Sequence, residues 1–396
     1  MVRHKLFILP ILCLMFFAQS CVHGDLDDCP PMVNYAVAFK YTNHMDKTDR
    51  FYDDVKKINL YVFDENNLIY TTTTDLGPHK ENFNVPLDLP MGNYHIIAWG
   101  NVLDSQPFSV TSYDGDDENA FIKGKTTIEE ARLILQRNAD NLSQTELEKL
   151  FYGELDVEVP LYISRVDTMP LMNNTNHVRV VLHWDHTGAV KTAEKIVDYD
   201  EVIVRLTGNN AVYDFDNEFI SNKVVYAPYA IDNTGAILNT ERKSNWLNIY
   251  YYPDSIKEVS DSTVYDFKIL RMVVDHEMKL TVLRKKPALD AENLFISPDA
   301  PNRYDTDYGL DIIGNSAGTL GFTKAMLART DLGISGSDPL IVKEEKMQRV
   351  FDRYENYRVD VYFRFDELAN TYISTVVISV EDWHVIKNPG HHGGAN

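Results

Sequence analysis

The sequence has few cysteines, few basic residues and no long apolar run. Its cysteines are Cys13, Cys21 and Cys29, too few for the disulfide framework of a small secreted domain. The apolar run Leu6 to Phe17 has 12 residues, whereas a membrane-spanning helix needs ~20. There are 38 Lys and Arg against 59 Asp and Glu, a net charge of −21. Because nucleic-acid binding needs clustered Lys and Arg, a nucleic-acid-binding protein is not expected.

Motifs of the common enzyme classes are also absent. The chain has no GxGxxG, P-loop lysine, HExxH or CxxC motif. Gly333-Ile-Ser-Gly-Ser337 departs from GxSxG at its last position. His391 and His392 lie in a terminal tail, where nothing fixes the geometry of metal ligands. The acidic stretches 114–118 and 305–311 could hold calcium, but solvated turns are the simpler interpretation. We therefore expect no enzymatic activity, no cofactor and no metal site.

The N-terminus has the features of a secretion signal. Arg3, His4 and Lys5 precede the apolar run, and the small residues Ala18 and Ser20 follow it. The next residue is Cys21, and this arrangement resembles a bacterial lipobox, in which the cysteine is acylated and becomes the new N-terminus. Two alternatives remain open. One is an ordinary signal cut near Ser20, leaving Cys21 to pair with Cys29, and the other is a retained membrane anchor.

Removal of residues 1–20 leaves 36 basic and 59 acidic residues, a net charge of −23. With Cys13 removed and Cys21 acylated, Cys29 has no intramolecular partner, so the fold must be stable without disulfides. Residues 21–32 read as a linker, because its aspartates and Pro30-Pro31 cannot be buried. This acidic cluster also resembles the surface-export signal of Bacteroidales lipoproteins, with a plain solvated linker as the alternative.

Alternating apolar residues predict β-strands through most of the remaining chain. Runs over 33–39, 58–62, 202–206, 278–283, 359–365 and 371–380 place apolar side chains at every second position. In Pro90-Met-Gly-Asn-Tyr94 the proline stiffens a turn and Gly92 can adopt positive φ. A similar turn recurs in prealbumin-like β-sandwiches. The pattern predicts an all-β sandwich protein.

A few short helices are expected between the strands. Thr127-Ile-Glu-Glu130 and Ser143-Gln-Thr-Glu146 fit the capping box and predict helices over 128–138 and 144–151. A helical crossover is expected at about 190–199 and a short helix near Gly321–Leu327. The rest of 285–347 is predicted to form turns.

The polar segment Met169-Pro-Leu-Met-Asn-Asn-Thr-Asn176 is the predicted domain boundary. The expected organisation is a signal peptide at 1–20, a lipidated acidic linker at 21–32, sandwich domains at 33–172 and 173–387, and a flexible tail at 388–396.

Several short motifs, taken in order, resemble the FimB/Mfa-type minor fimbrial subunits of Bacteroidales, the anchor lipoproteins of type V pili. These motifs are Cys21 with Asp27-Asp28-Cys29-Pro30, Val55 to Asp64, Leu89 to Tyr94, Trp99 to Asn101, Leu150 to Gly153 and Ile378 to Trp383. The resemblance implies two tandem transthyretin-like (prealbumin-like) β-sandwich domains. It also implies outer-membrane attachment through Cys21 and a non-enzymatic role.

The role that the resemblance implies is to anchor the fimbrial shaft to the cell and, in the better-known members, to limit its length. The expected partners are fimbrial shaft (pilin) subunits, which in this group polymerise by strand exchange. The docking strand is expected within 359–386, because this run is long, regular and near a terminus. The alternative function is a surface carbohydrate-binding lipoprotein, with Trp246 and Tyr250 to Tyr252 stacking on sugars. A buried aromatic strand is the simpler interpretation of that run.

Two further features follow from the resemblance. Shaft and tip subunits of this group are cut after an Arg near the start of the first domain, and Arg50 lies at a similar place. Cleavage there would separate the lipid from the body, so Arg50 is interpreted as an ordinary loop residue. Thr168, Ser255 and Ser262 lie in Asp-Ser/Thr-apolar triplets that resemble O-glycosylation sites of exported Bacteroidales proteins. Triplets this short also arise by chance.

Overall fold

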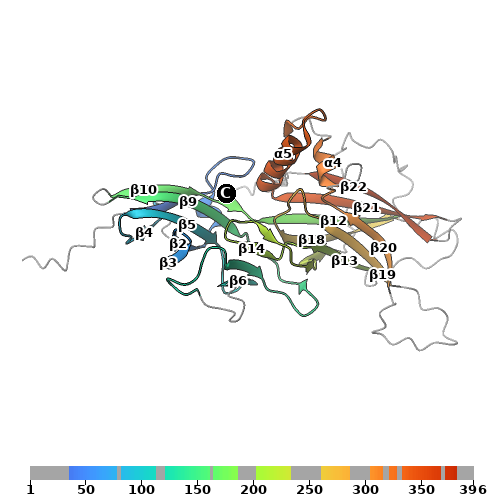
Figure 1. Cartoon of the computed structure of the whole chain (residues 1–396). Helices are drawn as coiled ribbons and strands as arrows, with labels where there is room; N and C mark the ends of the chain where they lie inside the picture. The colour runs from blue at the N-terminus through green and yellow to red at the C-terminus, as the bar shows by residue number, and fades with distance from the viewer. Residues whose placement is uncertain are drawn as a thin grey trace, which may run out of the picture.

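Strands dominate the architecture, which confirms the all-β sandwich expectation. The computed structural model describes residues 35–77, 82–112, 121–160, 164–185, 202–232, 260–285, 304–314, 321–327, 332–366 and 371–380. The molecule is elongated, with packed sheets in two lobes along its length and helices α4 and α5 on one side of the second lobe (Figure 1). The predicted crossover at 190–199 and the aromatic run at 246–252 lie outside the described residues.

The first lobe contains a three-stranded sheet, in the order β10-β1-β4, and a five-stranded sheet, in the order β11-β9-β5-β2-β3. The short helix α2 (Phe51–Asp54) precedes β2. The strands are β1 (Tyr35–Lys40), β2 (Lys57–Asp64), β3 (Asn67–Asp75), β4 (Asn84–Leu87), β5 (Gly92–Gly100), β9 (Phe151–Val159), β10 (Arg165–Pro170) and β11 (Met172–Asn173).

The five-stranded sheet is buried on both faces, as the sequence of β2 requires. Leu60 and Val62 pack into the core between the two sheets of this lobe. Tyr61 and Phe63, on the opposite face, pack into a second, larger core. Because every side chain from Leu60 to Phe63 is apolar, neither face of the strand can be left in water.

A third sheet covers that second face, in the order β15-β14-β7-β6. Its strands are β6 (Phe108–Ser112), β7 (Ala131–Leu135), β14 (Val212–Asp214) and β15 (Phe219–Ile220). The rings of Tyr61 and Phe215 lie 5.0 Å apart, and those of Trp99 and Tyr213 lie 5.9 Å apart. Strands from before and after the predicted boundary at 172/173 therefore share one sheet, and the domain division stays a proposal.

The second lobe is a sandwich of two five-stranded sheets, in the orders β17-β18-β12-β21-β22 and β20-β19-β13-β16-β8. Val178, Val180 and Leu182 of β12 and Val204 and Leu206 of β13 belong to the core between them. The first sheet contains β12 (Thr175–Asp185), β17 (Ala230–Asp232), β18 (Ser260–Leu270), β21 (Asn356–Asp366) and β22 (Thr371–Val380). The second contains β8 (Leu142–Ser143), β13 (Val202–Gly208), β16 (Val224–Tyr226), β19 (Lys279–Lys285) and β20 (Tyr304–Asp311).

Each lobe has a parallel strand pair among mainly antiparallel ladders. In the first lobe β1 pairs with β10, from Tyr35↔Arg165 to Lys40↔Pro170. In the second lobe β12 pairs with β21, from His177↔Asn356 to Asp185↔Arg364. In both pairs, then, an early strand of the lobe lies beside a much later segment of the chain.

Two helices predicted from capping boxes are wrong. Residues 131–135 form β7, in which Ala131, Leu133 and Leu135 are buried at every second position. The backbone N–H of Thr127 does donate to Glu130 Oε2 at 3.0 Å, but this bond closes a turn that leads into the strand. Residues 144–150 form no helix either. Burial of apolar side chains in the core overrode the local capping signal.

The helix expected near Gly321–Leu327 is confirmed as α4 (Phe322–Leu327). A longer helix, α5 (Leu340–Arg353), occupies a region predicted as turns up to residue 347. Its buried residues are Met347, Val350 and Phe351, at the i, i+3 and i+4 spacing of a helix face. The ring of Phe351 and that of Phe322 in α4 both pack on Tyr357 of β21, at 5.7 and 4.9 Å.

The polar segment read as a boundary is buried rather than exposed. Asn173, Asn174 and Asn176 are 5%, 0% and 4% exposed. Asn174 Nδ2 donates to the side-chain oxygen of Asn217, and Asn176 Nδ2 donates to the carbonyl of Tyr354 at 3.1 Å. Because buried amides must be hydrogen-bonded, these contacts hold the junction between the lobes in one arrangement.

Candidate functional site

The residues predicted to carry modifications fall in different surroundings. Cys21 and Ser255 lie outside the described residues. Thr168 lies exposed on β10, an edge strand of the first lobe, so an O-glycan there remains a proposal. Ser262 of β18 is only 8% exposed, which leaves little room for a glycan on its hydroxyl.

Arg50 lies where the backbone is held by several hydrogen bonds. Its N–H donates to the carbonyl of Tyr41 at 2.9 Å. Asp49 Oδ1 accepts from the N–H groups of Tyr41 and Phe51, both at 3.0 Å. Phe51 itself is fully buried. A protease must bind its substrate as an extended strand, so this geometry protects the Arg50–Phe51 bond and supports the interpretation of Arg50 as a structural residue.

β22 is the candidate docking strand. It pairs with β21 along its whole length, from Thr371↔Asp366 to Val380↔Tyr357, and it ends its sheet. No strand in the described residues pairs with its other edge. Such an edge offers unpaired N–H and C=O groups to an added strand. The predicted docking range 359–386 covers most of β21 and all of β22, and residues 381–386 lie outside the described part.

Helices α4 and α5 lie beside this sheet (Figure 1), and α4 contacts β22. The first turn of α5 exposes two large apolar side chains, Leu340 at 70% and Ile341 at 66%. Lys343 Nζ donates to the carbonyl of Gly336 at 2.7 Å, and Lys346 Nζ donates to that of Gly333 at 2.9 Å. The loop before α5 is therefore tied to the helix, and the two apolar side chains are held in place on the surface. Sequence reasoning missed them, although an apolar pair directly after Asp338-Pro339 was an available helix-start signal.

Charged side chains join the two lobes at their junction. Lys149, which precedes β9, places Nζ 2.9 Å from Asp54 Oδ2 of α2 and 2.8 Å from Glu355 Oε1, next to β21. The hydroxyl of Tyr41 donates to the same Glu355 oxygen at 2.8 Å. Burial, and secondarily the charge of Glu355, raises the pKa of Tyr41, so its hydroxyl stays protonated as a donor. These groups hold the first lobe to the segment that starts β21.

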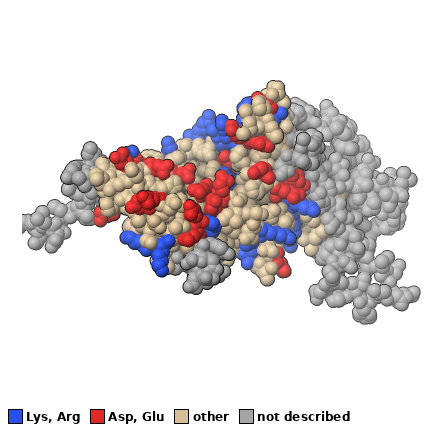
Figure 2. Space-filling view, in the orientation of Figure 1, with Lys and Arg blue, Asp and Glu red and all other residues tan. Residues whose placement is uncertain are grey.

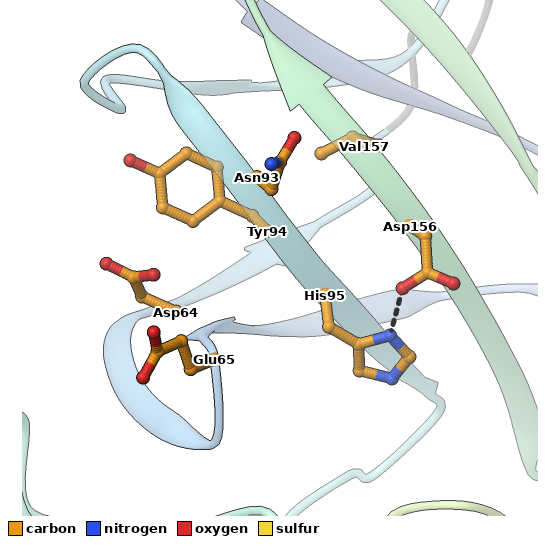
Figure 3. Close-up of a pocket in the computed structure, with 7 residues that line it drawn as sticks. All are labelled: Asp64, Glu65, Asn93, Tyr94, His95, Asp156 and Val157. Atoms are coloured by element: carbon orange, nitrogen blue, oxygen red, sulfur yellow. Dashed lines mark hydrogen bonds and ion pairs between the residues drawn. The ribbon is translucent and has the colours of Figure 1, made fainter.

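A recess of about 610 Å³ lies on the first lobe, lined by Asp64, Glu65, Asn93, Tyr94, His95, Asp156 and Val157 (Figure 3). His95 Nδ1 lies 2.7 Å from Asp156 Oδ1. A His–Asp pair can activate a hydroxyl or thiol nucleophile, but no Ser, Thr or Cys lines the recess. The described residues also contain no cluster of three or more metal-ligating side chains. Within the described residues, the recess therefore offers neither a hydroxyl or thiol for His95 to activate nor a cluster of three metal ligands.

The turn beside the recess is closed by Tyr94, whose hydroxyl donates to the carbonyl of Pro90 at 3.0 Å. Gly92 is not in the positive-φ region that the sequence suggested. Its close approach to Tyr94 is the relevant feature instead, because a Cβ there would lie 3.1 Å from Tyr94 Oη and 3.2 Å from Cζ and would require the ring to shift. The Pro-x-Gly-x-Tyr motif thus fixes the entry into β5. In the part of the chain that the structure describes, no helix is long and apolar enough to cross a membrane.

Comparison with known proteins adds family and fold. The model of the fimbrillin-A associated anchor proteins Mfa1 and Mfa2 matches residues 26–389. The fimbrial anchor protein Mfa2 of Porphyromonas gingivalis has a similar structure, with a TM-score of 0.56 at 15% identity over 88% of this chain and 97% of that one.

Two candidate adhesins also share the fold. One from Bacteroides ovatus gives a TM-score of 0.61 at 17% identity, over 88% of this chain and 93% of that one. One from Bacteroides thetaiotaomicron gives 0.58 at 19% identity, over 88% and 97%. A search of curated protein sequences finds no match.

Proposed function

Because the chain belongs to the family of fimbrillin-A associated anchor proteins, we propose that it anchors a type V fimbria to the outer membrane as a lipoprotein acylated at Cys21. A fimbrial anchor or adhesin role follows from the family match. The lipid, the mode of docking and a limit on shaft length are the proposed parts. The proposed location is the cell surface, with the body exposed and the lipid in the outer membrane.

The observation that carries the proposal is the separation between the start of β1 and the docking edge. Tyr35 pairs with Leu87 and Arg165 at one end of the first lobe, whereas Lys40 and Pro170 lie at the end next to the junction. A tether that reaches Tyr35 from Cys21 therefore enters at the end opposite the second lobe. β22 lies in the second lobe, so Tyr35 and the free strand edge are at different ends of the molecule, which supports the proposed arrangement.

The proposed docking surface is the free edge of β22, together with the exposed first turn of α5. Strand addition at such an edge joins subunits through backbone hydrogen bonds, and apolar side chains beside it add contact area. The proposed partner is a fimbrial shaft (pilin) subunit. The alternative carbohydrate-binding function depends on Trp246 and Tyr250 to Tyr252, which lie outside the described residues.

Two changes test the two ends separately. Cys21→Ala should release both the chain and its fimbriae into the medium, because the lipid attachment is lost. Thr375→Lys places a charge on the edge strand β22 and should release fimbriae while the chain stays on the membrane. Thr73→Lys, on the edge strand β3 of the first lobe, is the matched control and should retain fimbriae. Retention of fimbriae by the Thr375→Lys cells would exclude docking at β22, and a membrane-bound Cys21→Ala chain would exclude the lipid anchor.

A further inference from the structure

The two outer faces of the second sandwich differ in how their cations are paired. On the face formed by β12, β18 and β21, the described side chains of Arg179 and Arg358 each have a carboxylate partner. Arg179 Nε lies 2.6 Å from Asp266 Oδ1, and Arg358 Nε lies 2.7 Å from Asp360 Oδ2. His177 and His183 lie beside the same two carboxylates, at 3.2 and 2.7 Å. This face is therefore neutralised by its own side chains.

On the opposite outer face, the described charged side chains along β13, β16 and β19 are basic. Val204 and Leu206 of β13 point into the core, so Arg205 between them lies on the outside. Leu280 and Val282 of β19 place Lys279 on the same outer face by the same alternation. Lys279 and Val225 of β16 both pair with Thr207, one on each side of β13. Lys223 is two residues before Val225, and Arg137 donates to its carbonyl. These four cations, Arg137, Arg205, Lys223 and Lys279, define the basic face.

Within the described residues the cations of the basic face have no carboxylate partner. Arg205 Nη1 donates to the backbone carbonyl of Val204 at 2.9 Å. Arg137 Nη1 donates to the backbone carbonyl of Lys223 and, at 2.8 Å, to the amide oxygen of Asn222. Asp311 pairs with Lys279 in the β-ladder, but its carboxylate accepts from the N–H groups of Met278, Ile313 and Gly314.

Partial burial makes these unpaired charges less favourable. Arg205 is only partly exposed, and burial lowers the pKa values of both Arg205 and Arg137. A partly desolvated guanidinium without a carboxylate is costly in the isolated chain, and an incoming anion would offset that cost. The unpaired charge is thus a property that a partner can use.

The chemistry of the surface indicates an acidic protein as the occupant. The chain carries a net charge of −21, and Figure 2 shows basic and acidic side chains on both lobes, with one basic group on the second lobe. The half-buried aliphatic residues Ile203, Val225 and Leu283 lie among the cations on this face. Protein interfaces combine arginine with apolar area in this way. The face lies on the lobe away from Tyr35, so the membrane is not its partner under the proposed tether.

We propose that the basic face binds an acidic surface of a fimbrial subunit, as a second contact besides the β22 edge. This step rests on the anchor function proposed above. Opposite charges would speed the encounter and fix the orientation of the subunit, while the strand edge holds it.

The test uses the purified mature chain and fimbriae sheared from cells that make it. Binding is measured between 50 and 300 mM salt for wild type and for Arg205→Gln/Lys279→Gln. The control, Lys123→Gln/Lys125→Gln, also loses two positive charges, at exposed positions in the segment between β6 and β7. We expect the Arg205/Lys279 variant to bind about fivefold more weakly at low salt and to lose most of its salt dependence, with the control unchanged. Arg205→Lys/Lys279→Arg, which keeps the charge, should bind like wild type.

Equal affinity of wild type and the Arg205/Lys279 variant would overturn this inference. Binding of heparin, with no effect on fimbriae, would overturn it in favour of an anionic polysaccharide. If wild type itself does not bind the fimbriae, the proposed anchor function is refuted, and the inference that rests on it is refuted as well. A further outcome separates the two proposals. If Thr375→Lys abolishes binding and the Arg205/Lys279 change does not affect it, the basic face is not a contact, and the anchor function still holds.

Discussion

Lys149 of the first lobe and Glu355 of the second form an ion pair, with Nζ and Oε1 2.8 Å apart. The side chains are 31% and 14% exposed, and Asp54 and Tyr41 contact the same pair. Because partial burial weakens screening by water, this pair contributes more to the junction than an exposed one.

A double-mutant cycle with Lys149→Met and Glu355→Gln should give a coupling energy of about 1 kcal/mol in urea unfolding. The matched control is the pair of Lys56 and Glu148, which is as short, at 2.9 Å, but 54% and 42% exposed. That pair should couple by less than about 0.5 kcal/mol. Equal coupling in both cycles would show that the Lys149–Glu355 pair does not stabilise the junction.

Gly92→Ala should destabilise the chain by about 1–2 kcal/mol, because the new Cβ meets the ring of Tyr94. Tyr94→Phe removes the bond to the Pro90 carbonyl and should cost about 1 kcal/mol. Gly336→Ala is the control, since a Cβ there meets no atom within 4 Å. Thermal unfolding of the three variants measures these losses of stability. A neutral Gly92→Ala would contradict the role of the close approach.

Trypsin should leave the Arg50–Phe51 bond of the native chain intact. Asp49→Ala removes the acceptor of two backbone N–H groups and should increase cutting at this bond by roughly tenfold, because local opening becomes easier. Asp46→Ala, an exposed change in the same loop, should have no effect. The new N-terminus Phe51 is detected by mass spectrometry, and rapid cutting of wild type there would refute the protection.

Asp266 predicts acid sensitivity of the second lobe. Burial alone would raise the pKa of this carboxyl, but its bonds with His177 and Arg179 outweigh burial and lower the pKa to about 2, from 3.8. A depressed folded-state pKa stabilises the fold above the unfolded value. The contribution, roughly 2 kcal/mol, is therefore complete above about pH 4 and is lost as pH falls from 4 toward 2. Asp266→Asn should be less stable at pH 7, and its urea midpoint should change less between pH 4 and 2 than that of wild type.

Sequence periodicity predicted the strands because burial imposes it locally. Val359 and Val361 in β21 are fully buried at alternate positions, and this pattern is visible without a structure. The same pattern over 131–135 was overlooked in favour of a capping box, which occurs in turns as well as at helix starts. The helix α5 was missed because only one end of it is buried, so its apolar period is short.

The contacts that join the lobes had no local signal at all. Lys149 and Glu355 are 206 positions apart, and neither residue stands out among the other charged residues of the chain. The buried asparagines at 173–176 had the composition of an exposed linker, because sequence alone does not show whether an amide finds partners inside the protein. The basic face was hidden for a similar reason, since its cations come from four separate segments.

The register of the strands has a mechanical consequence. Under the proposed function, a fimbria would pull the molecule between its N-terminal attachment and the edge of β22. That load runs along β1, whose ladder bonds to β10 and β4 lie across the direction of pull. β21 and β22 are joined by ten register pairs, and β21 and β12 by nine more. Bonds loaded in shear must break together, whereas bonds that are peeled from one end break one after another. The strand directions thus suit the molecule to sustained tension.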